Sequence, residues 1–281
     1  MTSIKYNIEK VGDNSMIFHI FNQLYYRFRY FAANSNSIFQ KIFQNLFLDV
    51  FYSIAGKRLK RKAAKCKSIE DYVDLALNYK CSLFKDELPI IILTPQQIES
   101  ELLAFSKFIY GFNPKNILEI GTANGGTFFL LSRLSGEDST LISIDLPINA
   151  YIGGIDYKSK AFYKSFALNS QKIEIIRGDS HKKSSLREVK GYLNGDKLDL
   201  LFIDGDHTYK GVKKDFKLYS PLVRKHGIIA FHDIVKVPSD ENVEVNKFWN
   251  DLKKNYKYYE FVEDWNQGYC GIGIIFKDTK I

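Results

Sequence analysis

Two apolar runs with the composition of buried strands, at 198–203 and 228–231, each end in side chains that can do chemistry. These side chains are Asp204, Asp206, His207, His232 and Asp233. If the two strands are neighbours, Asp204 and Asp233 meet at one edge of a sheet, where carboxylate oxygens suit Mg²⁺ or Ca²⁺. His207 would then be placed to take a proton from a hydroxyl that the metal makes more acidic.

A second informative segment is the turn between an apolar run at 117–120 and a helical pattern that begins at Thr127. Gly121 opens this turn and Gly125 closes it. A strand, a glycine turn and a helix N-terminus together direct backbone N–H groups toward a ligand. Glu119, at the end of the strand, would repel a pyrophosphate and attract an ammonium group. The turn therefore favours S-adenosyl-L-methionine over NAD as the cofactor.

Two further strand ends carry carboxylates that suit the rest of such a cofactor. Asp145 lies 24 residues beyond Gly121, and a carboxylate at about this distance holds the ribose hydroxyls in dinucleotide-binding folds. Asp179 follows the next predicted strand, where it could accept a hydrogen bond from an adenine amino group. Structural alternatives stay open: a helix cap for Asp145, a plain turn at Asp179, and a cap of the next helix for Asp206.

The order of these segments predicts the fold. Strands are predicted at 117–120, 141–145, 172–176, 198–203, 228–231 and 272–276. Helical patterns separate them, and Thr94 with Pro95 predicts a helix that begins there and ends near Tyr110. This alternation favours an α/β fold with a doubly wound, mostly parallel sheet, whose ligands bind outside the carboxyl ends of the strands.

The composition is that of a soluble globular protein, with 45% apolar and 26% charged residues in 281. Cys66, Cys81 and Cys270 are odd in number and lack Cys-x-x-Cys spacing. We therefore expect neither a disulfide framework nor a zinc site, and a cytoplasmic location fits best. No uncharged stretch approaches the roughly 18 residues that span a bilayer, and the first residues do not resemble a signal peptide.

Residues 1–85 are predicted to form a helical N-terminal extension, and residues 86–281 the domain that carries the site. Phenylalanine recurs every four residues at Phe39, Phe43, Phe47 and Phe51. This spacing predicts a helix with an aromatic face, which favours core packing or a homo-oligomer contact.

The excess positive charge is concentrated at 57–67, which holds seven Lys or Arg and no acid. The rest of the chain is nearly neutral, with 33 basic and 32 acidic residues. Together with the aromatic helix, residues 38–67 could lie peripherally on an anionic membrane surface. Nucleic-acid binding is not expected, because no recognition motif accompanies the basic run.

These segments together resemble class I S-adenosylmethionine-dependent methyltransferases, in the branch of the macrocin-type and rhamnosyl O-methyltransferases and the cephalosporin-hydroxylase-like proteins. The resemblance covers about residues 90–276. It rests on 118–126 (LEIGTANGG), 143–147 (SIDLP), 176–181 (IRGDSH), 201–212 (LFIDGDHTYKGV), Asp215, 219–222 (YSPL) and 227–234 (GIIAFHDI). It implies a seven-stranded Rossmann-like methyltransferase sheet.

The resemblance also implies roles for single residues. Those assigned to the cofactor are Glu119, Gly121, Thr122, Gly125, Asp145, Asp179 and Ser180. Those assigned to a metal, Mg²⁺ or another divalent cation, are Asp204, His232 and Asp233. His207 would be the general base. Two departures matter: Ala123 stands where many relatives have glycine, which would strain a turn that needs positive φ, and His232 stands where some have glutamate.

The predicted reaction is an SN2 transfer of a methyl group from sulfonium to a hydroxyl oxygen of a small molecule or glycan. Segments 147–160 and 236–245 are expected to be loops that shape the acceptor site, with 265–271 as an aromatic wall. Three alternatives stay open: an iron hydroxylase that uses two histidines and one carboxylate, an NAD-dependent oxidoreductase, and a non-catalytic binding protein. The absence of Gly-x-Gly-x-x-Gly disfavours the second.

Overall fold

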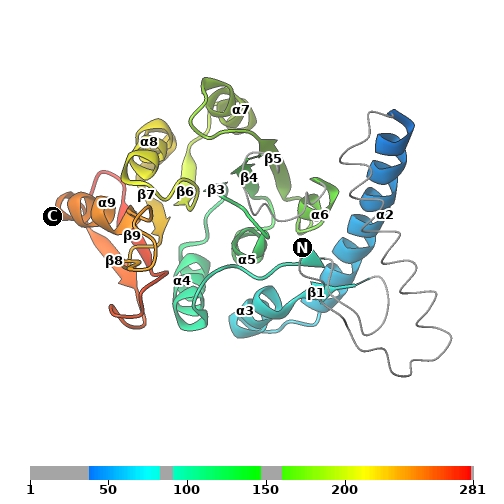
Figure 1. Cartoon of the computed structure of the whole chain (residues 1–281), viewed down its shortest axis with the longest axis horizontal. Helices are drawn as coiled ribbons and strands as arrows, with labels where there is room; N and C mark the ends of the chain where they lie inside the picture. Colours follow the sequence, from blue (N-terminus) through cyan, green and yellow to red (C-terminus); the bar gives the residue numbers. More distant parts are fainter. Residues whose placement is uncertain (1–37, 83–90, 147–159, 280–281) are drawn as a thin grey trace, which may run out of the picture. The chain divides into compact units, whose positions relative to one another are not determined.

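The structure is a computed structural model that describes residues 38–82, 91–146 and 160–279 (Figure 1). The chain divides into two compact units, Met1–Val50 and Phe51–Ile281. The second unit contains the sheet and all of the predicted site residues. Most of the predicted acceptor loop at 147–160 lies outside the described residues, as do the side chains of the phenylalanine stripe.

The second unit is built on one seven-stranded sheet with the strand order β5-β4-β3-β6-β7-β9-β8. Its strands are β3 (Asn116–Ile120), β4 (Thr140–Asp145), β5 (Lys172–Arg177), β6 (Leu198–Ile203), β7 (Val223–His232), β8 (Tyr258–Phe261) and β9 (Ile272–Phe276). Strands β3 to β7 pair in parallel, whereas β9 and β8 are antiparallel to their neighbours. This confirms the predicted doubly wound, mostly parallel sheet.

The strand order reverses at β3, which is where ligands bind in folds of this kind. β3 pairs with β4 on one side and with β6 on the other, so three carboxyl ends lie side by side. β6 pairs with β7, and Ile203 faces Phe231 in the register. The sequence predicted that Asp204 and Asp233 would meet if the strands before them were neighbours. Because β6 and β7 are neighbours, this condition is met.

Helices lie on both faces of the sheet, which explains why its central strands are mostly apolar. The helices are α2 (Ile38–Ala63), α3 (Ile69–Asn78), α4 (Glu99–Phe112), α5 (Gly126–Leu134), α6 (Lys160–Lys164), α7 (Lys183–Leu193), α8 (Tyr209–Tyr219) and α9 (Val245–Leu252). Helices α7, α8 and α9 cover one face, and α3, α4 and α5 the other (Figure 1). Short elements complete the unit: β1 (Lys80–Cys81), β2 (Ile91–Ile92), η2 (Ser220–Leu222) and η3 (Lys253–Asn255).

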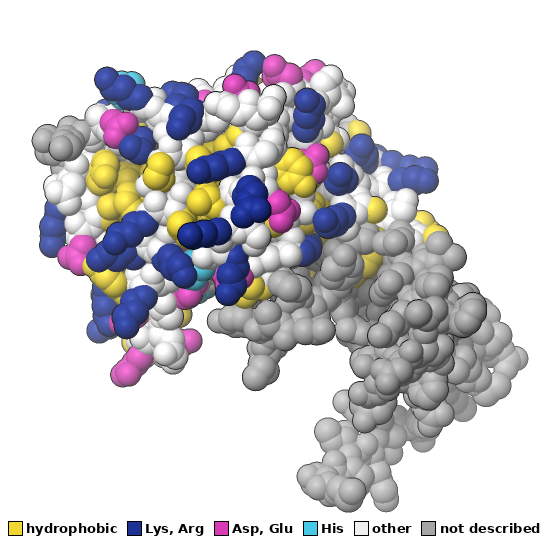
Figure 2. All heavy atoms as spheres, turned by 90° about the horizontal axis from the view of Figure 1, so that it is seen from above, with side chains coloured by type: hydrophobic (Ala, Val, Ile, Leu, Met, Phe, Trp, Pro, Cys, Tyr) yellow, Lys and Arg dark blue, Asp and Glu magenta, His cyan; other side chains and the backbone are white. Residues whose placement is uncertain are grey.

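The face covered by α7 and α8 is rich in basic side chains (Figure 2). Its basic residues are Lys183, Arg187, Lys190, Lys210, Lys213, Lys214 and Lys217. On these two helices the acids are Glu188, which is exposed, and Asp215, which is fully buried. Positive charge is therefore dense here as well as at 57–67, although the chain outside 57–67 is nearly neutral as a whole.

Two strand predictions were incomplete. β8 was not located in the sequence, because this edge strand has two exposed tyrosines followed by two half-buried residues and contains no buried apolar run. β7 begins at Val223 rather than 228, since its first residues are largely exposed and read as a polar segment. Both errors concern residues whose strand conformation depends on a neighbouring strand rather than on burial of both faces.

The predicted helix start at Thr94 was wrong, because α4 begins at Glu99. The Thr94 hydroxyl donates to the carbonyl of Leu77 at 2.8 Å instead of capping a helix. Pro95 packs against Gly126, where an added Cβ would lie 2.4 Å from the proline ring. Tertiary contacts therefore hold this segment extended beside the start of α5.

The basic run forms the end of α2 and the turn that follows it. Arg58 donates to the carbonyl of Ser82 at 2.8 Å, and the Lys62 ammonium lies 5.7 Å from the centre of the Tyr79 ring. Two of the seven basic side chains thus have contacts within the fold. Among the described helices, none combines the length and apolar character needed to cross a bilayer.

Candidate active site

The side chains that follow β6 and β7 form one cluster. The His207 ring lies between two carboxylates, with Nε2 3.4 Å from Asp204 Oδ1 and Nδ1 3.1 Å from Asp233 Oδ2. His232, the last residue of β7, places Nδ1 3.2 Å from Asp204 Oδ1 and 3.4 Å from Asp233 Oδ1. The three predicted metal ligands and the predicted base therefore come together at one sheet edge.

Electrostatic pairing dominates this cluster. Burial would raise the pKa of Asp204, but the imidazoles of His232 and His207 outweigh it and lower that pKa to about 2. Burial would lower the pKa of His207, but hydrogen bonding and attraction to Asp204, with Asp233, raise it to about 9. The pKa of His232 is raised by the same two carboxylates against the effect of burial. Without a metal, the imidazoles therefore hold protons that balance the carboxylates.

The cluster offers donors for a divalent cation, although the group that contains Asp204 includes His207, the predicted base, where the sequence predicted His232. Ligand atoms of Asp204, His207 and Asp233 all lie within 4.8 Å of one another. His232 is only 4% exposed, and neither of its ring nitrogens has a well-formed hydrogen bond within the described residues. Carboxylate oxygens suit Mg²⁺ or Mn²⁺, whereas imidazole nitrogens suit Fe²⁺ or Zn²⁺ better. The arrangement thus supports a cation without selecting Mg²⁺.

Cys270 is a member of this site that the sequence did not predict. Its thiol lies with the ligand atoms of His232 and Asp233 in a second group within 4.8 Å, and it donates to the carbonyl of Gln96 at 3.5 Å. Asp233 and Cys270 both have left-handed backbone conformations, with φ of 58° and 60°. Nothing near Cys270 in the sequence signals this contact, which follows from the pairing of β7 with β9.

The glycine turn after β3 adopts the conformation that its residue types require. Gly121 and Gly125 have φ of 87° and 85°, and Ala123 has φ of 44°. Ala123 therefore adopts a positive φ although it carries a Cβ. The turn is held by the Tyr163 hydroxyl, which donates to the Ala123 carbonyl at 2.9 Å.

Glu119 is buried at the end of β3, and its Oε2 has no hydrogen-bond partner among the described residues. Burial raises the pKa of this carboxyl well above its ordinary value, against the hydrogen bond from Thr122. Thr122 in turn pairs with the hydroxyl of Ser143 on β4. A buried carboxyl oxygen without a partner is the feature that a bound ammonium group would satisfy, so the residues fit the methionine end of the predicted cofactor.

Asp145 and Asp179 continue this row along the sheet edge. Asp145 accepts from the backbone N–H of Ala123 at 2.8 Å and of Leu146 at 2.7 Å, and burial raises its pKa. Asp179 accepts from the backbone N–H of His181 at 2.8 Å. Asp179 therefore forms a turn, which was the structural alternative given for this residue. The hydrogen bond from His181 uses Oδ1 alone of its two carboxylate oxygens.

Asp206 lies outside the metal cluster. Its Oδ1 accepts from both the backbone N–H and the hydroxyl of Thr208, at 3.0 and 2.8 Å. Thr208 is the N-cap of α8 and accepts from the backbone N–H of Gly211 at 3.0 Å. Asp206 thus supports a helix cap without being the cap itself.

Part of the chain that carries this site is similar to a known family. Residues 118–234 match the Methyltransf_24 family model, which describes a methyltransferase domain. This part of the chain contains the glycine turn and both ends of the acidic and histidine cluster. Residues 118–234 of the chain are therefore similar to a methyltransferase domain, and they lie on a Rossmann-like sheet.

Two curated proteins and one solved structure illustrate the similarity. The chain is 33% identical over 147 residues to the uncharacterized protein R132 of Acanthamoeba polyphaga mimivirus, covering 51% of this chain and 64% of the relative. It is 31% identical over 135 residues to tapetum-specific methyltransferase 1 of Arabidopsis thaliana, covering 47% of this chain and 52% of the relative. These matches span about half to two thirds of each relative.

A solved structure from Klebsiella pneumoniae, named as a candidate O-methyltransferase, matches with a TM-score of 0.50. The two chains are 16% identical, and the match covers 81% of this chain and 98% of that one. At this identity the likeness shows the fold alone.

Proposed function

We propose that this protein transfers a methyl group from S-adenosyl-L-methionine to a hydroxyl of a small molecule or glycan. The observation that carries the proposal is the position of the buried Glu119 carboxyl, whose Oε2 has no hydrogen-bond partner among the described residues. It lies on β3, directly beside the strand that ends in the Asp204 and His207 cluster. A cofactor held at Glu119 would therefore lie next to a proton acceptor.

The residues that would hold the cofactor lie in a row from β3 to β5. Glu119 would accept from the ammonium of the methionine part, with Thr122, Gly121 and Gly125 shaping the turn around it. Asp145 would accept from the ribose hydroxyls, which requires it to exchange its contact with the Ala123 N–H. Asp179, with Ser180 beside it, would accept from the adenine amino group through its second carboxylate oxygen. These seven residues are the cofactor site that we propose.

When bound, the cofactor would supply a sulfonium-activated methyl group that an oxygen nucleophile can attack in one step, with S-adenosylhomocysteine as the leaving group. His207 would remove the proton of that oxygen at Nε2, because Asp233 accepts from Nδ1 at 3.1 Å. The ring must be neutral to do so, while the two carboxylates raise its pKa to about 9. A divalent cation at Asp204, His232 and Asp233, Mg²⁺ or a transition metal, would offset their charge and lower this pKa.

The acceptor that fits such a site best carries neighbouring hydroxyls, as a sugar or a catechol does, because two oxygens can reach one cation. This agrees with the macrocin-type and rhamnosyl O-methyltransferase branch that the sequence resembles. We propose this branch and leave the particular acceptor to experiment.

A second candidate function is supported by one observation, the meeting of two imidazoles with two carboxylates. Two histidines and a carboxylate form the iron site of many non-heme oxygenases. The cofactor row at Glu119, Asp145 and Asp179 would then have no role. Oxygen consumption by the Fe²⁺-loaded protein without S-adenosyl-L-methionine would favour this candidate.

The proposed reaction can be tested by tritium transfer from methyl-labelled cofactor to catechol and to a rhamnoside. We expect transfer that EDTA abolishes, and a loss of about 100-fold or more in His207→Ala. Transfer that survives both EDTA and Asp204→Ala would contradict the metal site. Failure of the folded protein to bind the cofactor at all would overturn the proposed function.

A further inference from the structure

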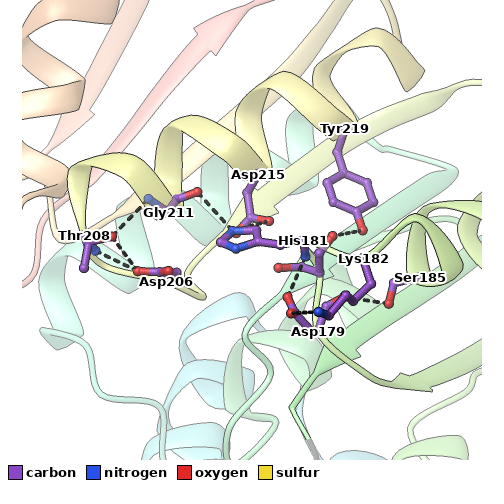
Figure 3. Close-up of polar contacts among 10 residues, drawn as sticks. Asp179, His181, Lys182, Ser185, Asp206, Thr208, Gly211, Asp215 and Tyr219 are labelled. Carbon is purple, nitrogen blue, oxygen red and sulfur yellow. Dashed lines mark hydrogen bonds and ion pairs between the residues drawn. The ribbon is translucent and has the colours of Figure 1, made fainter.

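Helix α8 carries a buried carboxylate that the proposed mechanism does not use. Asp215 is fully buried, and neither of its oxygens has a well-formed hydrogen bond in the described part of the chain. Its side chain points from α8 toward the His181 ring, as Figure 3 shows. His181 Nε2 lies 3.4 Å from Asp215 Oδ1. Burial raises the pKa of Asp215 to about 6, and the Ser180 hydroxyl and His181 act against this rise.

The His181 ring is fixed by α8 at two points. Its Nε2 is 3.2 Å from the backbone carbonyl of Gly211, and a carbonyl can only accept, so this nitrogen carries a hydrogen. The same N–H faces Asp215. His181 belongs to the loop between β5 and α7, so the pair ties this loop to α8 (Figure 3).

The loop held in this way contains the two residues proposed to flank adenine. The backbone N–H of His181 donates to Asp179 Oδ1 at 2.8 Å, whereas Oδ2 forms an ion pair with the Lys182 ammonium at 3.8 Å, beyond hydrogen-bond distance. On the other side of the loop, the Tyr219 hydroxyl of α8 donates to the Ser180 carbonyl at 2.7 Å. Residues of α8 therefore contact two adjacent residues of this loop, Ser180 and His181.

We propose that Asp215 is a positioning residue for the adenine end of the cofactor, acting through His181 on Asp179 and Ser180. The inference rests on the proposed function and deepens it. It adds a second role for α8, whose first turn follows the Asp204 and His207 cluster directly. One helix thus connects the adenine loop with the site of proton transfer.

The experiment compares two ligands by calorimetry, S-adenosylhomocysteine and 5′-methylthioadenosine. Both contain adenine and ribose, and only the first contains the amino-acid part. In Asp215→Asn we expect both dissociation constants to rise by the same factor, about tenfold or more, because a charged partner of the His181 N–H is removed. In Glu119→Gln we expect weaker binding of S-adenosylhomocysteine alone.

A matched control is Asp199→Asn. Asp199 lies at the opposite end of β6, where it accepts from Arg224 Nε at 2.5 Å and from the backbone N–H of Lys115 and Asn116 at 2.9 Å. This variant loses a structural carboxylate of similar importance, and we expect it to bind both ligands as the wild type does. Equal weakening in Asp199→Asn would assign the effect to general destabilisation and overturn the proposal.

His181→Gln provides the second variant, because loss of a fully buried carboxylate can prevent folding. We expect the same parallel weakening of both ligands in this variant. A folded Asp215→Asn or His181→Gln protein that binds 5′-methylthioadenosine with wild-type affinity would overturn the positioning role. Absence of binding to the wild-type protein would instead refute the proposed function.

Discussion

The backbone carbonyl of Asp204 occupies the space that a side chain at Gly121 would need. A Cβ built on Gly121 would lie 1.9 Å from that carbonyl oxygen. The Asp204 N–H also donates to the carbonyl of Ile120 at 2.8 Å. The turn proposed to hold the cofactor is therefore in direct backbone contact with the end of β6, where the catalytic cluster begins. Because of this contact, movement of one of them requires movement of the other.

This contact predicts that Gly121→Ala affects both halves of the site. The variant combines a backbone clash with a φ of 87°, so we expect it to lose about 3 kcal/mol of unfolding free energy. Denaturation in urea measures this loss. Gly191→Ala is the control, because no atom lies within 4 Å of its added Cβ and the residue is helical. A Gly121→Ala protein as stable as Gly191→Ala would contradict the described contact.

Glu119→Gln should separate stability from function. The folded state disfavours the charged carboxylate, as its raised pKa indicates, so a neutral amide should raise the melting temperature. The same change removes the charge proposed to attract the cofactor ammonium, so the dissociation constant should rise about tenfold or more. Thermal melting and calorimetry on one preparation measure the two effects. A variant that is less stable and binds equally well would refute both arguments.

The His207 pKa predicts how the metal-free protein responds to pH. The pKa rises from 6.5 to about 9 on folding, so the stabilisation is complete below pH 6.5 and is lost as pH rises through 9. Asp204 acts in the opposite direction, because its pKa falls from 3.8 to about 2 and its contribution is lost in acid. Urea denaturation in EDTA should show the unfolding free energy falling between pH 6.5 and 9. The decline should be smaller in His207→Gln, and an identical decline would contradict the pairing.

The sequence predicted the sheet and its strand ends well, for a physical reason. Strands buried on both faces must be apolar, and their carboxyl ends carry the polar residues, so runs such as 198–203 identify themselves. The turn at Gly121 could be predicted because glycine tolerates a backbone with positive φ, whereas Ala123 adopts a positive φ that its residue type does not signal.

What the sequence could not predict depends on contacts between distant segments. Cys270 reaches His232 through strand pairing, and Asp215 reaches His181 through helix packing. Thr94 resembles a helix cap until its hydroxyl is seen to bond Leu77. Each residue type permits several partners, and only the folded chain selects one.

The membrane contact expected of residues 38–67 stays a prediction that the structure sharpens. Arg58 and Lys62 contact other parts of the fold and should be left unchanged. The variant to make changes Lys57, Lys60, Arg61, Lys65 and Lys67 to glutamine. With about 1 kcal/mol for each basic residue near an anionic surface, sedimentation with phosphatidylserine vesicles should fall at least tenfold.

The control for vesicle binding is the basic face of α7 and α8. A variant with Lys183, Arg187, Lys190, Lys210 and Lys214 changed to glutamine removes the same number of charges. We expect it to sediment as the wild type does. Equal loss in both variants would assign the binding to net charge rather than to residues 38–67.

Calorimetric titration of the wild-type protein with S-adenosylhomocysteine, with and without Mg²⁺ or Mn²⁺, tests the central claim most directly. We expect one binding site per chain, formed by the row of residues from Glu119 to Asp179. The affinity of this site for S-adenosylhomocysteine should be lower in Glu119→Gln. A folded protein that releases no heat with this ligand, and shows no change in melting temperature, would contradict it.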